Sequence, residues 1–259
     1  MIGHKDRYAL VTGATSGIGY ELVKLLAKDG KNLIIVARDK KRLEEVKTEI
    51  ENEYRTRVKL LPKDLSDPKA PVEIFSELEK EDINVDVLVN NAGFVVYGLF
   101  SETDLQKELE MIQLYVSTLT HMTKLFLKKM LENKSGWILN VSSGMALLSV
   151  PVLSVYSASK AYTLHFSEAL ANELHGTGVS VTCLCPPQTE TEIFRRAKIE
   201  NTKLARSKKM GAATVAEAGY IALKKGKVIV TPGLKSQLLP IVIRILPRSV
   251  LTKMARSMV

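Results

Sequence analysis

Thr12-Gly13-Ala14-Thr15-Ser16-Gly17-Ile18-Gly19 is the stretch that decides the fold of this 259-residue chain. It follows an apolar run at residues 8–11 and opens a helical pattern that begins near Gly17 and ends before Gly30. Glycine allows the sharp backbone turn that joins a strand to a helix. A strand, a glycine-rich turn and a helix in this order begin a βαβ unit. The stretch therefore predicts an α/β fold with a parallel sheet.

Short apolar runs alternate with helical patterns along the rest of the chain. The expected strands are residues 8–11, 33–37, 58–61, 85–90, 137–141, 179–184 and 227–231. The expected helices are residues 17–29, 39–54, a segment capped by Asp67 with Pro68 in its first turn, 104–131, 156–175 and 214–225. Many of the strands are almost continuously apolar, as strands buried on both faces are. Seven strands without a linker rich in Pro, Gly and Ser predict one sheet in one domain.

The composition is that of a globular chain, because 46% of the residues are hydrophobic. The most apolar stretch, residues 238–246, contains Pro240 and Arg244 and is far shorter than the roughly 20 residues that span a membrane. The N-terminus has neither an apolar export segment nor a small-residue cleavage site, which favours a cytoplasmic location. Cys183 and Cys185 share one face of an expected strand and are expected to be reduced packing residues.

The net charge of +9 is unevenly distributed. Residues 1–192 carry 22 Lys and Arg against 26 Asp and Glu, whereas residues 193–259 carry 15 against 2. This basic C-terminal quarter has no recognisable nucleic-acid motif and no interleaved aromatic residues, so nucleic acid is not expected as a partner. Anionic substrates or a membrane surface fit its charge better.

The glycine-rich turn has the context of a phosphate-binding site. A pyrophosphate is favoured at the exposed N–H groups of a helix start, and glycine lets the backbone approach it closely. The spacing Gly-x-x-x-Gly-x-Gly differs from the commoner Gly-x-Gly-x-x-Gly, and the alternative is an ordinary tight turn. Because a strand precedes the turn and a helix follows it, we predict a nucleotide site. Its expected residues are Gly13, Thr15, Ser16, Gly17, Ile18 and Gly19.

Further strand ends extend this prediction to a dinucleotide. At the end of the second expected strand, the guanidinium of Arg38 can pair with a 2′-phosphate, which favours NADP over NAD. The alternative is that Asp39 caps the next helix and Arg38 is solvated. Asp64 and Leu65 follow the third strand and are placed to meet the adenine, and Asn91 follows the fourth. Ligands of open α/β sheets bind at these carboxyl ends of the strands.

Tyr156 and Lys160 are predicted to carry carbonyl chemistry. Reduction of a carbonyl needs a hydride on carbon and a proton on the developing alkoxide. Tyr156 can supply the proton, and Lys160, four residues later on the same helix face, is expected to lower the phenol pKa from about 10. Ser143, at the end of the fifth expected strand, can donate a hydrogen bond to the carbonyl oxygen.

The spacing Tyr-x-x-x-Lys is weak on its own, because it occurs three times in the chain. Tyr20/Lys24 and Tyr220/Lys224 lie in amphipathic helices without a strand-end serine before them. We expect both pairs to be packing or solvated residues. The four histidines form neither a nucleophile motif nor a metal pattern, so no metal site is expected. The pair that begins at Tyr156 remains as the catalytic candidate.

These motifs, in this order and at this spacing, resemble the short-chain dehydrogenases/reductases over essentially the whole chain. The matching residues are Thr12 to Gly19, Asp64, Asn90-Asn91-Ala92-Gly93, Ser143, Tyr156 and Lys160. The resemblance implies a single Rossmann-type, doubly wound α/β domain with a seven-stranded parallel sheet and helices on both faces. It also implies Tyr156 as acid/base, Lys160 as the group that shifts its pKa and binds the cofactor ribose, and Ser143 as donor to the carbonyl. Thr191 resembles the threonine that contacts the nicotinamide carboxamide.

Two residues depart from the family pattern. The family usually has an asparagine that supports a water in the proton relay, and Tyr115 stands at the matching position. A phenol could displace that water, narrow the pocket, or point elsewhere while another group holds the water. Pro187 replaces a usual glycine and stiffens the entrance to a substrate loop at about residues 186–212. By family analogy this loop covers the substrate.

The chain is most similar to a branch of broad or undefined specificity with a C-terminal extension. The expected activity is that of an NADP(H)-dependent carbonyl reductase, which interconverts a hydrophobic ketone or aldehyde and its alcohol, with NAD(H) as the second choice of cofactor. The alternatives are a 3-oxoacyl carrier-protein reductase and a non-catalytic NADP-binding sensor or scaffold.

The extension, residues 236–259, is basic and amphipathic and follows an expected cofactor-binding and catalytic part at residues 1–235. It could lie on a membrane surface as a peripheral contact. Alternatively, its apolar face packs over the pocket or against another subunit, which is the favoured interpretation. Family analogy implies a homodimer or homotetramer.

Overall fold

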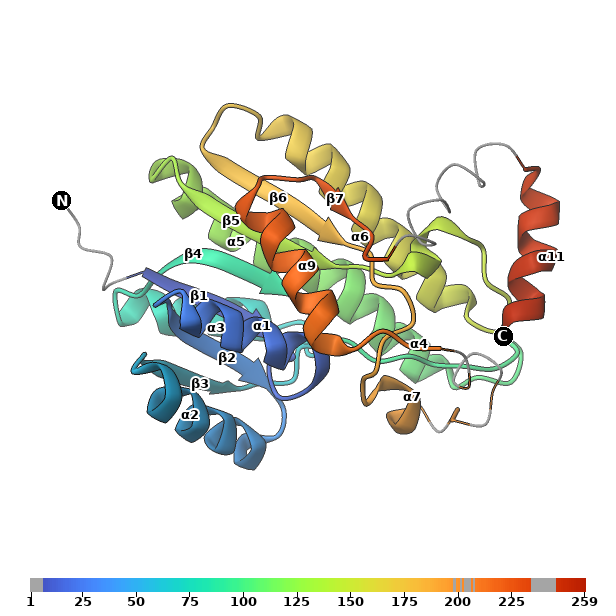
Figure 1. Ribbon diagram of the computed structural model, residues 1–259, viewed down its shortest axis with the longest axis horizontal. Coiled ribbons are helices and arrows are strands. Elements are labelled where there is room, and N and C mark those ends of the chain that lie inside the picture. The colour runs from blue at the N-terminus through green and yellow to red at the C-terminus, as the bar shows by residue number, and fades with distance from the viewer. Residues whose placement is uncertain (1–6, 198, 201, 203–205, 207, 234–245) are drawn as a thin grey trace.

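A computed structural model of the chain describes residues 7–197, 199, 200, 202, 206, 208–233 and 246–259. Seven parallel strands form one sheet in the order β3-β2-β1-β4-β5-β6-β7 (Figure 1). The strands are β1 (Arg7–Thr12), β2 (Asn32–Ala37), β3 (Val58–Pro62), β4 (Asn84–Asn90), β5 (Gly136–Val141), β6 (Val179–Leu184) and β7 (Ile229–Val230). The chain order changes direction between β1 and β4, and a crevice is expected outside the carboxyl ends of the strands there. The predicted seven-stranded parallel sheet is confirmed.

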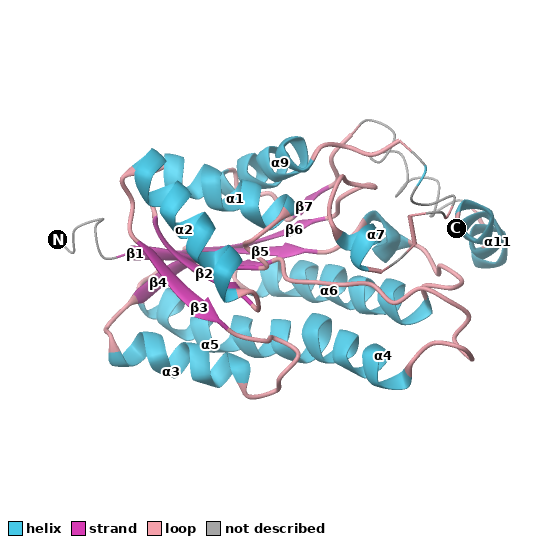
Figure 2. Cartoon of the chain, turned by 90° about the horizontal axis from the view of Figure 1, so that it is seen from below, coloured by secondary structure: helices cyan, strands magenta, loops and turns pink. Residues whose placement is uncertain are grey.

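Helices cover both faces of this sheet, which confirms the doubly wound arrangement. One layer contains α1 (Gly17–Lys28), α2 (Lys40–Tyr54) and α9 (Ala212–Lys224) (Figure 2). The other contains α3 (Ala70–Lys80), α5 (Leu119–Glu132) and α6 (Ser154–Glu173), with α4 (Leu105–Ile112) extending it toward the carboxyl ends of the strands. Two short helices, a 3₁₀ turn at Gly144–Leu147 and α7 (Ile193–Arg196), lie in the loops beyond β5 and β6.

Two apolar clusters, one on each face of the sheet, form the core. Ala9 and Val11 of β1 belong to the cluster that contains Leu22 and Leu26 of α1, whereas Leu10 between them belongs to the opposite cluster. Successive strand residues point to opposite faces, and all five side chains are fully buried. A fully buried leucine contributes about 1.5–3 kcal/mol to folding. Burial on both faces thus explains the continuous apolar runs in the sequence.

The long helix expected at residues 104–131 is interrupted in the structure. Between α4 and α5, residues Gln113–Thr118 form a π-helical segment. Such segments are rare and occur mostly within helices at functional sites. A second difference concerns α3, which begins at Ala70 with Pro71 in its first turn. Asp67 does not cap it; its carboxylate accepts a hydrogen bond from the backbone N–H of Lys69 (2.9 Å).

The last described element, α11 (Arg248–Met258), lies beyond the carboxyl edge of the sheet (Figure 1). Leu251 and Ala255 on this helix are 7% and 1% exposed, whereas Val250 and Met254 are 41% and 48% exposed. The predicted C-terminal extension is thus described from residue 246 onward, and its residues 236–245 lie outside the described residues. Among the described helices, none combines the length and the hydropathy that a membrane crossing requires.

Candidate active site

A cavity of about 1030 Å³ opens where the carboxyl ends of the strands meet the glycine-rich turn and the start of α6. It brings together nearly all of the site residues that the sequence predicts. They are Gly13, Thr15, Ser16, Gly17, Ile18, Arg38, Asp64, Leu65, Asn91, Ser143, Tyr156, Lys160 and Thr191. Gly19 is the exception among the described residues, because it does not line the cavity.

The glycine-rich turn packs so tightly against its neighbours that a larger residue in place of its glycines would force the surrounding atoms to move. Gly13 and Gly17 have φ angles of 65° and 56°, a left-handed conformation that favours glycine. A Cβ on Gly17 would lie 2.9 Å from the side chain of Thr191. A Cβ on Gly19 would lie 2.3 Å from Asn91 Nδ2 and Gly13 O. Gly19 therefore serves the close packing of the turn.

The side chains of Thr12 and Asn91 fasten this turn to the end of β4. Asn91 Nδ2 donates hydrogen bonds to Thr12 O (2.9 Å) and Gly13 O (3.2 Å). Thr12 Oγ1 accepts from the backbone N–H groups of Asn91 (2.9 Å) and Ala92 (3.0 Å) and donates to Val89 O (3.1 Å). The amide of Asn91, predicted to bind a cofactor, is occupied with holding the turn.

The turn fits the pyrophosphate of a dinucleotide. Ser16 precedes α1 with an extended backbone, and its side chain caps none of the helix amides. The first N–H groups of a helix have no partner within the helix and attract an anion. Gly13 and Gly17 line the cavity and have no side chain, so their backbone is open to a ligand there. The residues that would hold the pyrophosphate are therefore those of the predicted turn.

Arg38 and Asp64 lie at the neighbouring ends of β2 and β3. Arg38 Nη1 is 3.8 Å from Asp64 Oδ2, and the Arg38 side chain is 66% exposed. Asp39 caps α2 by accepting from Arg42 N (3.0 Å). Partial burial raises the pKa of the Asp64 carboxyl, but hydrogen bonds from the hydroxyl and N–H of Ser66 outweigh it and the pKa is lowered. Asp39 thus caps α2 and Arg38 is solvated, as the alternative interpretation has it, but Arg38 also lines the cavity, where a 2′-phosphate could reach it.

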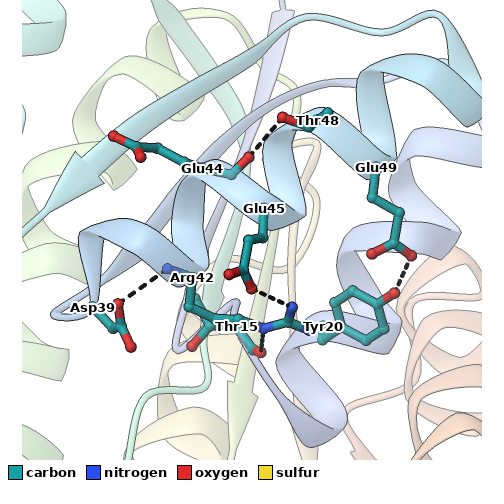
Figure 3. A network of polar contacts seen from close by, with 8 residues as sticks. All are labelled: Thr15, Tyr20, Asp39, Arg42, Glu44, Glu45, Thr48 and Glu49. Carbon is teal, nitrogen blue, oxygen red and sulfur yellow. Dashed lines mark hydrogen bonds and ion pairs between the residues drawn. The ribbon is translucent and has the colours of Figure 1, made fainter.

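A polar network behind the turn ties it to α2 (Figure 3). Arg42 Nε donates to Thr15 O (3.4 Å), while its Nη1 pairs with Glu45 (2.9 Å). Tyr20, on α1, donates from its hydroxyl to Glu49 on the same side of α2. The first of the two competing Tyr-x-x-x-Lys pairs is therefore a packing and hydrogen-bonding element, as expected.

The second competing pair does not line the cavity. Tyr220 Oη and Lys224 Nζ each donate to Asp29 Oδ2 at 2.6 Å. These bonds join α9 to the C-terminal end of α1, where Asp29 is the cap. Tyr220 and Lys224 therefore have a structural role, in agreement with the sequence-based interpretation.

Ser143, Tyr156 and Lys160 converge on the cavity from β5 and α6. Ser143 follows β5, and its Oγ accepts from Met145 N (3.1 Å). Tyr156 is 9% and Lys160 4% exposed. Burial raises the pKa of the Tyr156 phenol, against the opposing effect of a hydrogen bond with the Ser143 side chain. Burial also lowers the pKa of Lys160 to about 7.

The predicted effect of Lys160 on Tyr156 is not met in the structure. Lys160 Nζ donates to Val141 O (2.8 Å) and lies 5.9 Å from the centroid of the Tyr156 ring. The pKa of the Tyr156 phenol is raised by burial instead of lowered by the ammonium. The ring closest to the ammonium belongs to Tyr115, whose centroid is only 3.7 Å from Lys160 Nζ.

Tyr115 is the residue of the site whose contacts the sequence left open. It is 3% exposed, lines the cavity, and meets the Tyr156 ring edge to face with centroids 5.9 Å apart. Its hydroxyl donates to Phe94 O (2.7 Å). Of the three possibilities for this phenol, the one in which it points elsewhere is wrong. The departure from the family pattern was the only signal in the sequence that marked this position.

The part of the cavity wall next to Tyr115 and Tyr156 is apolar. Tyr115 and Tyr156 share a cluster with Val150, Phe194 and Ala255. Ala255 and Val259 bring α11 to the cavity wall, so the described part of the C-terminal extension packs over the pocket. This contribution was one of the alternatives in the sequence interpretation. The predicted substrate loop, residues 186–212, also lines the cavity through Gln188, Phe194, Arg196 and Lys208, among others.

Two negative predictions concern cysteines and metals. Cys183 and Cys185 are buried free thiols, with their Sγ atoms 3.8 Å apart on one face of the strand end, so their expected role as reduced packing residues agrees with the structure. In the part of the chain that the structure describes, no group of three or more His, Cys, Asp or Glu residues is arranged to hold a metal ion.

Comparison with known proteins identifies relatives of this chain. The family model described as short chain dehydrogenase matches residues 7–202. A very-long-chain 3-oxoacyl-CoA reductase from Anas platyrhynchos is 34% identical over 198 residues, which cover 74% of this chain and 62% of that protein. The chain thus spans less than two thirds of the length of this relative. An uncharacterized oxidoreductase from Staphylococcus saprophyticus is 29% identical over 87% of this chain and 94% of its own length.

A solved structure gives the same result at the level of the fold. The short-chain dehydrogenase from Sphingobium yanoikuyae, in complex with NADPH, superposes with a TM-score of 0.84 at 28% identity. The match covers 92% of each chain.

Proposed function

The chain belongs to the short-chain dehydrogenase/reductase family, and we propose that it is an NADP(H)-dependent oxidoreductase that interconverts a hydrophobic ketone or aldehyde and its alcohol. The observation that carries the proposal is the joint lining of one cavity by the glycine-rich turn and by Ser143, Tyr156 and Lys160. A nucleotide cradle and a proton donor beside an apolar wall are the parts that carbonyl reduction requires.

In the proposed mechanism, NADPH held in the cavity would supply the hydride for the carbonyl carbon. Tyr156 donates a proton to the carbonyl oxygen, and Ser143 donates a hydrogen bond to the same oxygen. Lys160 lines the same cavity, where its ammonium would bind the cofactor ribose. The apolar wall around Val150, Phe194 and Ala255 excludes water from the reacting atoms. Alcohol oxidation uses the same groups in reverse.

Binding of the cofactor is assigned to the predicted turn and to the strand ends. The helix start at Gly17 would hold the pyrophosphate, Asp64 and Leu65 would border the adenine, and Thr191 would meet the nicotinamide carboxamide. Arg38 supports NADP(H) over NAD(H), because its guanidinium lines the cavity beyond the end of β2 and can pair with a 2′-phosphate. The NADPH complex of the Sphingobium relative supports the same choice.

The substrate proposal rests on the apolar wall, which suits a hydrophobic carbonyl compound. A 3-oxoacyl thioester is the second candidate, since the Anas relative is a 3-oxoacyl-CoA reductase. The exposed cations Arg196 and Lys208 at the cavity edge would suit an anionic carrier. Turnover of acyl thioesters without turnover of simple ketones would favour this candidate. NADPH binding without oxidation across a broad panel would favour the non-catalytic sensor or scaffold.

Assembly and location follow as part of the same proposal. Residues 1–235 would form the cofactor-binding and catalytic unit, with residues 236–259 as its extension. Packing of Ala255 against the cavity wall supports an intramolecular role for this extension, although the exposed Val250 and Met254 leave room for a peripheral membrane contact. We propose a cytoplasmic homodimer or homotetramer. Size-exclusion chromatography with light scattering and a liposome-binding assay test these two statements.

The experiment that tests the proposed function is a panel of ketones, aldehydes, alcohols and 3-oxoacyl thioesters, assayed with NADPH and NADH and their oxidised forms. The wild-type protein is expected to turn over hydrophobic carbonyl compounds with NADPH. Tyr156→Phe is expected to lower kcat by about 10²–10⁴-fold, the usual contribution of a general acid. Unchanged turnover in this variant would remove Tyr156 from the mechanism.

A further inference from the structure

We propose that Tyr115 is a positioning residue of this site: its ring holds the ammonium of Lys160, and its hydroxyl ties that ring to the loop after β4. Its effect on turnover rests on the proposed function, whereas its effect on Lys160 does not. The ring centroid of Tyr115 lies 3.7 Å from Lys160 Nζ, and its hydroxyl donates to Phe94 O at 2.7 Å.

The backbone around Tyr115 is built to bring this ring into the site. Tyr115 lies within the π-helical segment Gln113–Thr118, which interrupts the regular helical hydrogen bonding between α4 and α5. On the opposite side, Gly93 leaves the space that the phenol occupies, since a Cβ there would lie 2.2 Å from Tyr115 Oη. A π-helical segment and a glycine, from two different parts of the chain, thus accommodate one side chain.

The Tyr115 ring is one of a few groups around Lys160 that favour a positive charge, together with Val141 O and the thiols of Cys183 and Cys185. Lys160 Nζ has a hydrogen-bond acceptor in Val141 O. The titratable groups that face it are the phenols of Tyr115 and Tyr156 and the thiols of Cys183 and Cys185. Burial disfavours the charged lysine. An aromatic face in a dry site attracts a cation more strongly than an exposed one does.

The consequence is that the charge and place of the lysine are set by an aromatic ring. The same ring contacts Tyr156 edge to face, with centroids 5.9 Å apart and planes at 79°. Tyr115 therefore touches both members of the predicted acid/base pair. Because its hydroxyl is bonded to Phe94 O, a movement of the loop after β4 would move the ring, and with it the ammonium.

The primary test measures Lys160 without any turnover. The protein is labelled with ¹³C at the lysine Cε, the Lys160 resonance is assigned with Lys160→Met, and its chemical shift is followed as a function of pH. Tyr115→Leu removes the ring, and Tyr115→Met repeats the test with a more adaptable side chain. Tyr115→Phe is the matched control, because it keeps the ring and removes only the hydroxyl. We expect the midpoint of the Lys160 titration to fall by about one pH unit in Tyr115→Leu and Tyr115→Met. In Tyr115→Phe the midpoint is expected to be the same as in the wild-type protein.

The second readout is the pH profile of kcat/KM for carbonyl reduction at saturating NADPH. A lysine that loses its proton more easily moves the alkaline limb to lower pH, so Tyr115→Leu is expected to shift this limb down by about one unit. Tyr115→Phe is expected to keep the limb and to raise KM, since it frees the loop at Phe94.

The two readouts separate this proposal from the proposed function. A Lys160 midpoint that is the same in Tyr115→Leu, Tyr115→Met and wild-type protein overturns the positioning role, whatever the activity. A lowered midpoint in a protein without carbonyl turnover supports the positioning role and removes the proposed function. A lowered midpoint with an unshifted kinetic limb overturns the catalytic consequence of Tyr115.

Discussion

A methyl group placed on Gly93 would lie 2.2 Å from the hydroxyl oxygen of Tyr115. The two residues come from the loop after β4 and from the π-helical segment before α5. Their fit lets the phenol reach Phe94 O and lets its ring lie against Lys160. Gly93 therefore provides the space in which the phenol beside Lys160 lies.

Gly93→Ala is expected to destabilise the protein by about 1–3 kcal/mol, because the added methyl group forces the Tyr115 side chain to move. The free energy of unfolding by urea measures this effect. In the Tyr115→Leu background the same substitution should cost clearly less, since the colliding hydroxyl is gone. Gly211→Ala is the matched control, as the nearest atom to its Cβ would be 4.0 Å away. Equal costs in both backgrounds would contradict the contact.

Arg38→Ala is expected to weaken NADPH binding about tenfold to hundredfold and to leave NADH binding nearly unchanged. A hydrogen bond to a charged group contributes about 1.5–3 kcal/mol, and only NADPH carries the 2′-phosphate. Isothermal titration calorimetry with both cofactors gives the comparison. Lys41→Ala removes an exposed cation of the adjacent helix that does not line the cavity, and it should affect neither. An equal loss of affinity for NADH would show that Arg38 does not bind the 2′-phosphate.

Ala255→Phe is expected to raise KM for a bulky ketone about tenfold while the Kd for NADPH stays the same. Ala255 is 1% exposed and lines the cavity, so a ring there must displace packed neighbours at about 1–3 kcal/mol. Val250→Phe on the same helix is the control, because Val250 is 41% exposed. Steady-state kinetics decide the matter; indistinguishable KM values for the two variants would remove α11 from the substrate site.

Asp29→Asn is expected to destabilise the protein at pH 7 by about 0.5–1 kcal/mol, as for a largely exposed ion pair. Hydrogen bonds from Lys224 and Tyr220 lower the pKa of the Asp29 carboxyl. The stabilisation is therefore present above the unfolded pKa of about 3.9 and is lost as the pH falls through the lower folded value. Urea denaturation at pH 7 and pH 3 should show the difference between variant and wild type shrinking at pH 3. A constant difference would mean that the charge of Asp29 is irrelevant.

Most of the fold could be predicted because each buried strand carries its own apolar signal. The apolar runs around Leu10 and Leu88 can be recognised as strands without knowing which strands they pair with. Both faces of a central strand are covered, so nearly every residue in it is apolar. β7 is shorter than predicted because it lies at the edge of the sheet, where Ile229 is 42% exposed and the pairing with β6 covers two residues.

The contacts within the site were less predictable than the list of its residues. The helical periodicity of residues 104–131 extends over many turns, so it predicts one continuous helix and does not reveal the short π-helical segment within it. The approach of Lys160 to Tyr115 joins two helical segments and follows from packing alone. Burial likewise depends on how the elements pack, and it raises the pKa of the Tyr156 phenol and lowers that of Lys160.

Hydride transfer from a nicotinamide cofactor to a carbonyl carbon is the central claim, and deuterium transfer measures it most directly. The wild-type protein is incubated with a hydrophobic ketone and with NADPH that carries deuterium at its transferable position, and the product is analysed by mass spectrometry. We predict an alcohol with one deuterium on the carbinol carbon, formed far more slowly by Tyr156→Phe. NADPH that binds but delivers no deuterium to any carbonyl compound or acyl thioester of the panel would contradict the claim.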